Sequence, residues 1–191
     1  MEEITVKVLL LGDDNVGKTT FLSRISGGGS SLDGRASFSL LRDTDQPFIF
    51  EVRNRRRTYR LEFSDTSSPE NWRSLEPDLV LICYDISQRS SLTNMQNVWI
   101  KEVHSCFRAG DQLPKMVVGL KRDLRSEDDA NGTIYPQEGY MVAQEMRVDK
   151  YVECSAATGE LLKLAFEEIC KMAAQTTTTA GAQSEGGCAI L

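Results

Sequence analysis

The stretch Gly12-Asp13-Asp14-Asn15-Val16-Gly17-Lys18-Thr19 fits the pattern G-x-x-x-x-G-K-[ST] without a gap. In such a loop the glycines allow backbone N–H groups to curl around a phosphate, and the following helix adds the positive end of its dipole. Lys18 is expected to reach the outer phosphates, and the hydroxyl of Thr19 is expected to bind Mg²⁺. The stretch therefore predicts a phosphate-binding loop, with a chance match of a short motif as the alternative.

The residues on either side of this loop are of the kind that the motif requires. The apolar run 6–11 predicts a buried strand, and residues 20–25 predict the start of a helix. Thr20 opens that helix and joins the loop residues as a candidate for phosphate contact. A strand, a glycine-rich loop and a helix in this order form the structural context of a P-loop.

The rest of the chain alternates between strand-like and helix-like patterns. Apolar or alternating runs predict further strands at 48–52, 58–63, 79–84, 116–120 and 151–154. Apolar residues at helical spacing predict helices over 92–106, from Pro136 towards Met146, and over 161–172. This order predicts an α/β fold with a mostly parallel six-stranded sheet, one antiparallel edge hairpin, and helices on both faces.

Length and composition restrict the class of protein. The 191 residues predict one domain, at 1–174, followed by a flexible polar tail at 175–191. A net charge of −6 argues against a nucleic-acid-binding protein. The five cysteines show no metal-ligand spacing, which favours a reducing compartment. Without a secretory leader or an apolar run of about 18 residues, the protein is expected to begin in the cytosol.

Three further motifs follow predicted strands. Asp65 ends the second hairpin strand, where its carboxylate could hold Mg²⁺ through water. Lys121-Arg122-Asp123 follows another strand and places a carboxylate where the ring N–H and amino group of guanine could be read. Ser155-Ala156-Ala157 follows the last strand, where small residues let the backbone approach a base. Strand ends of parallel strands meet at one edge of the sheet, so these motifs and the loop predict a single crevice.

With these motifs in this order, the sequence resembles the Ras superfamily of small GTPases, and most closely the Rho family. The segments Asp123-Leu124-Arg125, 98–103 and 151–156 are similar to Rho sequences. The resemblance implies the small G domain of the P-loop NTPases, with GTP or GDP and Mg²⁺ as ligands. It also implies effector proteins that bind the switch regions, an exchange factor, and the role of a signalling switch.

The resemblance includes the last four residues, Cys188-Ala189-Ile190-Leu191, which fit the C-a-a-X prenylation pattern. The final Leu favours geranylgeranyl on Cys188. No Lys or Arg follows Lys171, so attachment to a membrane should be reversible and insensitive to anionic lipid. We expect the protein on the cytoplasmic face of the plasma membrane or an internal membrane, and in the cytosol with a prenyl-binding carrier.

The chain departs from the family at the positions that serve hydrolysis. Asp14 stands where the family usually has Gly, and its carboxylate both crowds and repels a γ-phosphate. Ser68 replaces a Gly whose N–H contacts that phosphate, and Pro69 replaces the Gln that orients the attacking water. Proline offers neither a side-chain amide nor an N–H. No catalytic residue is therefore assigned, and weak or absent GTP hydrolysis is predicted.

Other departures affect binding and leave alternatives open. Leu120 replaces a polar Asn or Thr tether near the phosphate loop, which predicts fast nucleotide exchange. The first switch of the family supplies a threonine that binds Mg²⁺. Counting back from Asp65 places Asp43 at that position, and we select the adjacent Thr44 as the ligand. A short loop or single turn should replace the family's extra helix after Asp123. The alternatives to a locked switch are a pseudo-GTPase scaffold and a conventional GTPase cycled by activating and exchange factors.

Overall fold

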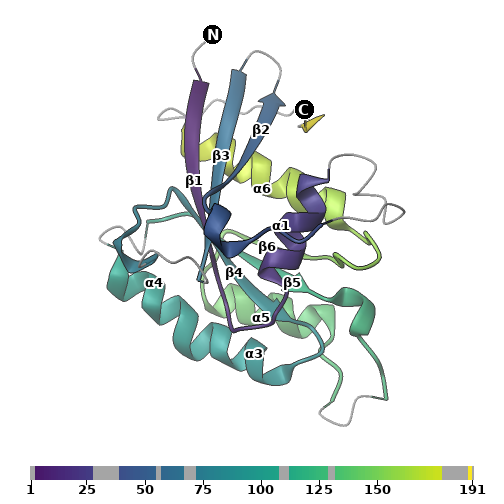
Figure 1. Ribbon diagram of the computed structural model, residues 1–191. Helices are drawn as coiled ribbons and strands as arrows, with labels where there is room; N and C mark the ends of the chain where they lie inside the picture. Colours follow the sequence, from purple (N-terminus) through teal and green to yellow (C-terminus); the bar gives the residue numbers. More distant parts are fainter. Residues whose placement is uncertain are drawn as a thin grey trace.

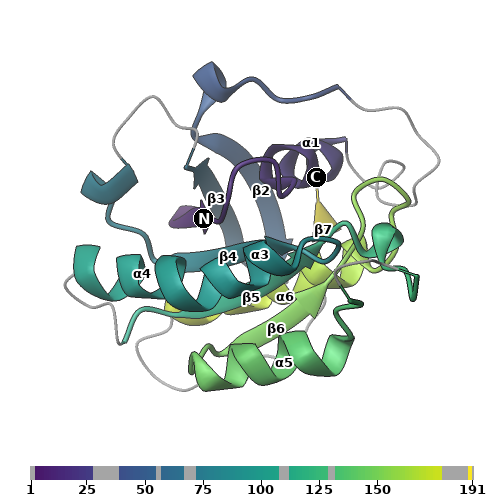
Figure 2. The same cartoon turned by 90° about the horizontal axis from the view of Figure 1, so that it is seen from below.

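The fold is an α/β sheet with helices on both faces (Figures 1 and 2). The computed structural model describes residues 3–27, 39–54, 57–66, 72–107, 112–128, 132–177 and 189–190. The strands are β1 (Glu3–Leu11), β2 (Phe48–Asn54), β3 (Arg57–Asp65), β4 (Leu79–Asp85), β5 (Lys115–Leu120), β6 (Lys150–Glu153) and β7 (Ala189–Ile190). They lie in the order β6-β5-β4-β1-β3-β2-β7.

The predicted sheet is confirmed, including its antiparallel hairpin. Strands β1, β3, β4, β5 and β6 run parallel, and β2 pairs antiparallel with β3. The two-residue strand β7 was not predicted; it pairs antiparallel with the edge of β2, with Ile190 opposite Val52. It lies within the predicted tail, whose residues 178–188 and 191 are outside the described part of the chain.

The helices follow the predicted pattern with one interruption. They are α1 (Lys18–Ser26), α3 (Arg89–Asn94), α4 (Ile100–Cys106), α5 (Pro136–Glu145) and α6 (Leu162–Thr176). Between α3 and α4 the chain forms a π-helical turn, η3 (Met95–Trp99), inside the helix predicted over 92–106. Short 3-10 turns lie at η1 (Asp43–Asp45), η2 (Trp72–Ser74) and η4 (Arg122–Leu124). The turn η4 follows β5 directly and contains Asp123. The short loop or single turn expected between Arg125 and Pro136 includes residues 129–131, which lie outside the described part of the chain, and it stays a prediction.

The sheet separates two hydrophobic layers. Helices α1 and α6 cover one face, while α3, η3, α4 and α5 cover the other. Alternate strand residues supply the two layers, so that Leu81 packs with α6 and Ile82 with α4 and α5. All seven residues of β4 are buried, as expected for a parallel strand covered on both sides. None of the helices in the described ranges is long and apolar enough to cross a membrane.

Helix α5 is held against the sheet through a glycine. A Cβ at Gly139 would lie 2.3 Å from the hydroxyl of Tyr151 and 2.5 Å from that of Tyr84. Tyr84 is fully buried, so its ring cannot swing aside. Only glycine lets the helix come this close.

We therefore expect Gly139→Ala to destabilise the fold. Alanine gains up to about 1 kcal/mol of helix propensity, but the clash with the hydroxyls of Tyr84 and Tyr151 should outweigh this and leave a net loss of about 1 to 3 kcal/mol. The free energy of unfolding in urea measures the effect. Gln137→Ala, at an exposed position of α5, is the matched control and should change stability by less than about 0.5 kcal/mol. An unchanged urea midpoint for Gly139→Ala contradicts this packing.

Candidate functional site

The glycine-rich loop lies directly on the backbone of β4. A Cβ at Gly12, where φ is +147°, would lie 2.3 Å from the carbonyl oxygen of Cys83. Gly17 has a φ of +108° and caps α1 without a side-chain hydrogen bond. Both positions need glycine, because L side chains avoid these conformations. The loop thus brings the N-terminus of α1 to the crevice with its first N–H groups free of any side-chain cap.

Lys18 folds back over this loop. Its side chain is buried, and Nζ donates to the carbonyl oxygens of Gly12 (3.0 Å) and Asp13 (2.9 Å). These partners are neutral, so the positive charge of the ammonium group is left to interact with an anion. A buried cation beside uncapped helix N–H groups fits a phosphate ligand.

The other loop residues divide between the surface and the core. Asp14 and Asn15 are exposed, and Asn15 adopts a left-handed φ of +63°. Val16 is buried in the hydrophobic layer of α1 and α6, and Thr20 is half-buried at the start of α1. The carboxylate of Asp13 accepts hydrogen bonds from α3 and η3. The side chains of this loop therefore point in several directions, and its backbone forms the cradle.

Thr19 and Asp65 come together as predicted for a metal site. The Thr19 hydroxyl donates to Oδ2 of Asp65 at 3.3 Å, and Asp65 is fully buried at the end of β3. A hydroxyl and a carboxylate oxygen are the hard ligands that Mg²⁺ prefers, with phosphate oxygens and water completing its shell. The two residues therefore fit Mg²⁺ bound together with a phosphate group. Within the described ranges, no group of three or more His, Cys, Asp or Glu side chains forms a separate metal site.

Gln46 is a residue of this site that the sequence did not indicate. Its Nε2 donates to Oδ1 of Asp65 at 2.8 Å, while the backbone N–H of Asp65 donates to its Oε1 at 2.9 Å. This double contact fixes the carboxylate so that its other oxygen faces Thr19. Thr44, the predicted metal ligand, lies exposed in η1 with its hydroxyl 3.4 Å from Oδ1 of Asp45. Its role as a ligand stays a prediction.

The base-recognition motif is joined to the phosphate loop by Lys121. This residue has a left-handed φ of +57°, and its Nζ donates to the carbonyl oxygen of Asn15 at 2.6 Å. The same atom lies 2.8 Å from Oδ2 of the buried Asp85. Although Leu120 removes the usual polar tether, Lys121 connects the two loops, and Asp85 at the end of β4 holds its ammonium group. The predicted fast exchange of nucleotide stays a prediction.

Asp123 and the loop that begins at Ser155 lie together. The Ser155 hydroxyl donates to Oδ1 of Asp123 at 2.5 Å and accepts from the N–H of Thr158 at 3.0 Å. Asp123 is exposed and is therefore accessible to a ligand, with Ser155 fixing its orientation. Ala156 is buried and Ala157 exposed in the same loop. The structure thus brings the phosphate loop, Thr19 with Asp65, and Asp123 with Ser155 to one edge of the sheet.

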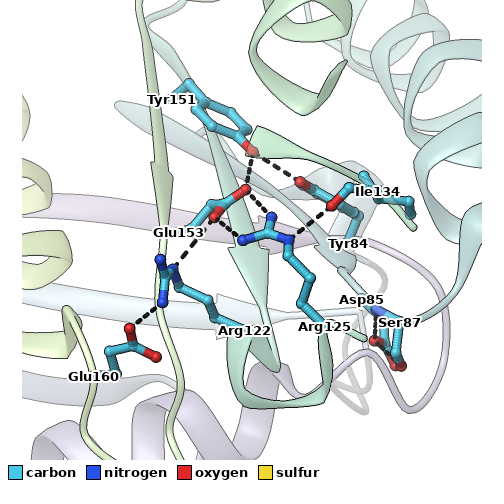
Figure 3. Close-up of polar contacts among 9 residues, drawn as sticks. All are labelled: Tyr84, Asp85, Ser87, Arg122, Arg125, Ile134, Tyr151, Glu153 and Glu160. Atoms are coloured by element: carbon cyan, nitrogen blue, oxygen red, sulfur yellow. Dashed lines mark hydrogen bonds and ion pairs between the residues drawn. The ribbon is translucent and has the colours of Figure 1, made fainter. Parts of the chain in front are cut away.

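A polar network around Glu153 includes Arg122 and Arg125, which flank Asp123 in the sequence (Figure 3). Glu153, at the end of β6, accepts from Nη1 and Nη2 of Arg125 at 2.9 and 2.5 Å. It also accepts from the Tyr151 hydroxyl at 2.5 Å, and Nε of Arg122 lies 3.5 Å away. Nε of Arg125 donates to the carbonyl oxygen of Ile134 at 2.7 Å, so the loop after η4 is tied to β6.

Burial sets the protonation of the tyrosines in this network. It raises the pKa of the Tyr84 and Tyr151 hydroxyls far above the ordinary value, and the negative charge of Glu153 acts in the same direction. For Arg125, burial acts to lower the pKa, but the hydrogen bond and charge of Glu153 raise it overall. The phenols therefore stay neutral and the guanidinium stays charged at physiological pH.

Comparisons with known proteins place this geometry in a family. The family model described as the Ras family matches residues 7–175. The chain belongs to the Ras family. All the predicted nucleotide motifs lie within the matched residues, which fits a small G domain.

The curated relatives are Rho proteins. The chain is similar to "GTP-binding protein RHO4" of Eremothecium gossypii, with 33% identity over 84% of this chain and 61% of that protein. It is 28% identical to "Rho-related protein racL" of Dictyostelium discoideum over 87% of the chain and 88% of that protein. It is 30% identical to "GTP-binding protein rho1" of Schizosaccharomyces pombe over 90% of the chain and 87% of that protein. This Ras-family chain is therefore Rho-like, as its resemblance implied.

The buried network yields a testable prediction about stability. Glu153→Gln removes a buried negative charge that two arginines face, and we expect it to destabilise the fold by about 3 to 5 kcal/mol. Glu160→Gln is the matched control: Glu160 pairs with Arg122 at the surface, and its loss should cost less than about 1 kcal/mol. Urea unfolding of both variants measures the difference. Equal losses of stability contradict the role of Glu153.

Proposed function

We propose that this Rho-like chain binds GTP and GDP together with Mg²⁺ and acts as a signalling switch. The observation that carries the proposal is the convergence of three groups of residues at one sheet edge. They are the cradle with the buried Lys18, the Thr19 and Asp65 pair, and the Asp123 carboxylate oriented by Ser155. Lys121 joins the phosphate cradle to the Asp123 motif through the carbonyl oxygen of Asn15. The names of the relatives RHO4 and rho1 as GTP-binding proteins support the same conclusion.

Each group has a distinct role in this proposal. The loop N–H groups and Lys18 hold the phosphates, while Asp123 and the loop of Ser155 bind the guanine. Thr19 and Asp65 hold Mg²⁺, which when bound neutralises charge on the phosphate oxygens. Gln46 keeps the Asp65 carboxylate in one orientation.

We further propose that GTP hydrolysis is weak or absent. Asp14 is exposed on the loop and adds a negative charge beside the phosphates. Ser68 and Pro69 lie outside the described residues, but their chemistry is known from the sequence. Pro69 lacks the amide with which a glutamine positions water, and phosphoryl transfer depends on positioning and electrostatics. Such a switch stays in the GTP form and is controlled through its abundance and location.

The test is the identity of the nucleotide that co-purifies with the protein, followed for hours at room temperature with Mg²⁺. We expect GTP that persists, and we expect Asp14→Gly/Ser68→Gly/Pro69→Gln to convert it at least about tenfold faster. Lys18→Ala should weaken binding about a hundredfold, because charge-assisted contacts to phosphate are lost. Lys163→Ala, an exposed lysine on α6, is the matched control.

Each outcome has a defined meaning. Bound GDP, or rapid conversion of GTP to GDP, contradicts the impaired hydrolysis and supports a conventional GTPase. A protein that binds neither nucleotide contradicts the switch and supports an interaction scaffold. Equal binding by the Lys18→Ala and Lys163→Ala variants contradicts the role of the loop.

The partners and location follow from the same family. We propose effector proteins at the switch regions, an exchange factor, and geranylgeranyl attachment at Cys188, which lies outside the described residues. With one lipid and no Lys or Arg after Lys171, the protein should exchange between a cytoplasmic membrane face and a cytosolic carrier.

Lipid attachment is tested by expressing the chain in eukaryotic cells. Mass spectrometry should detect the added lipid on the unchanged chain, and Cys188→Ser should abolish both the lipid and membrane binding. Cys106→Ser is the matched control and should change neither. Because no polybasic segment contributes, the membrane-bound fraction should be the same at low and high salt. Release of the protein by salt contradicts a purely lipid anchor.

A further inference from the structure

The long helix beside the phosphate loop contains a π-helical turn. Residues Met95–Trp99 form this turn between α3 and α4, and the N–H of Ile100 donates to the carbonyl oxygen of Met95, five residues back. π-turns are rare in proteins, and those that do occur lie frequently at functional sites. It changes which side chains of a helix share one face.

Two of the side chains that this turn aligns hold the loop. Nδ2 of Asn94 donates to Oδ2 of Asp13 at 2.8 Å, and Nε1 of Trp99 donates to Oδ1 of Asp13 at 2.7 Å. In an α-helix, residues five apart lie about 140° apart around the axis, so they do not share a face. The wider turn brings them onto the same face.

The negative charge of Asp13 explains why its carboxylate needs two hydrogen-bond donors. Asp13 stands inside a loop that cradles an anionic ligand, where its own negative charge opposes binding. Two neutral donors solvate both of its oxygens and keep the carboxylate on the helix side. On the other side, Lys18 donates to the backbone carbonyl of Asp13 at 2.9 Å. The loop is therefore held from both sides at this residue.

Trp99 also extends the connection beyond the loop. Its ring lies 6.3 Å from that of Trp72, which is in η2, after the Asp65 motif. The guanidinium of Arg73 lies 4.5 Å from the Trp72 ring centroid and pairs with Glu102 of α4 at 3.0 Å. One indole thus contacts both the phosphate loop and the segment that follows the second motif.

We propose that Asn94 and Trp99 form a clamp that positions the phosphate loop through Asp13 and slows nucleotide release. The proposal rests on the proposed function, because the clamp acts on the bound phosphates. Both residues act through the Asp13 carboxylate and not on the nucleotide itself, so both are positioning residues. Loss of a donor frees the Asp13 carboxylate to turn towards the phosphates and loosens the loop.

The first test exchanges the charged and amide groups. Asn94→Asp places two carboxylates together, and we expect it to raise the dissociation rate of N-methylanthraniloyl-GDP about tenfold. In Asp13→Asn/Asn94→Asp the introduced amide donates to the introduced carboxylate and still accepts from Trp99, so the rate should return to within about threefold of the original. Asn97→Asp, at an exposed position of the same turn, is the matched control and should have no effect. Urea midpoints show that each variant is folded.

The second test is spectroscopic, because the chain has two tryptophans, Trp72 and Trp99. In Trp72→Phe, Trp99 is the sole emitter, and its emission should change when the nucleotide is released by removal of Mg²⁺ with EDTA. Asp13→Ala in this background should abolish the change, since the contact that transmits it is gone. Packing alone would not produce this result.

The outcomes separate the two proposals. If the unchanged chain binds no guanine nucleotide, both the proposed function and the proposed clamp are wrong. If it binds nucleotide but folded Asn94→Asp releases it at the original rate, the clamp alone is wrong. An Asn94→Asp effect that the double variant does not reverse also overturns the clamp, because the damage then lies elsewhere.

Discussion

The approach of Gly12 to the carbonyl oxygen of Cys83 is the contact on which the site depends. No side chain fits at that point, since a Cβ would lie 2.3 Å from the oxygen. The loop can therefore lie flat on β4, which lets Lys18 fold back over it and aims α1 at the crevice. The parallel strands then bring Asp65, Lys121 and Ser155 to the same edge, because their carboxyl ends coincide there.

Most of the fold could be predicted from local sequence patterns. The strands β4 and β5 are buried on both faces and therefore appear as continuous apolar runs. The helix α6 is buried on one face and therefore shows apolar residues at helical spacing. The motifs also located Lys18, Thr19, Asp65 and Asp123. The strand β7 was missed, since two residues in a polar tail carry no periodic signal.

The supporting residues could not be predicted, because they act through contacts between distant segments. Gln46 contacts Asp65, Asp85 contacts Lys121, and Asn94 contacts Asp13 only through the tertiary structure. The π-turn is likewise invisible in the apolar spacing, because an added residue shifts the pattern by no more than one position. Sequence motifs thus predict the residues that would contact a ligand, whereas the residues that hold them in place emerge from tertiary structure.

The network at Glu153 also has a single direction of hydrogen bonding. The Tyr151 hydroxyl has one proton and donates it to Glu153, so in its 2.9 Å contact with Tyr84 it must be the acceptor. Every group therefore donates towards the same carboxylate, and the raised pKa of both phenols keeps this arrangement from reversing. The loop after β6 is accordingly supported by a chain of hydrogen bonds with one fixed direction, in which both phenols stay neutral across the pH range of a cell.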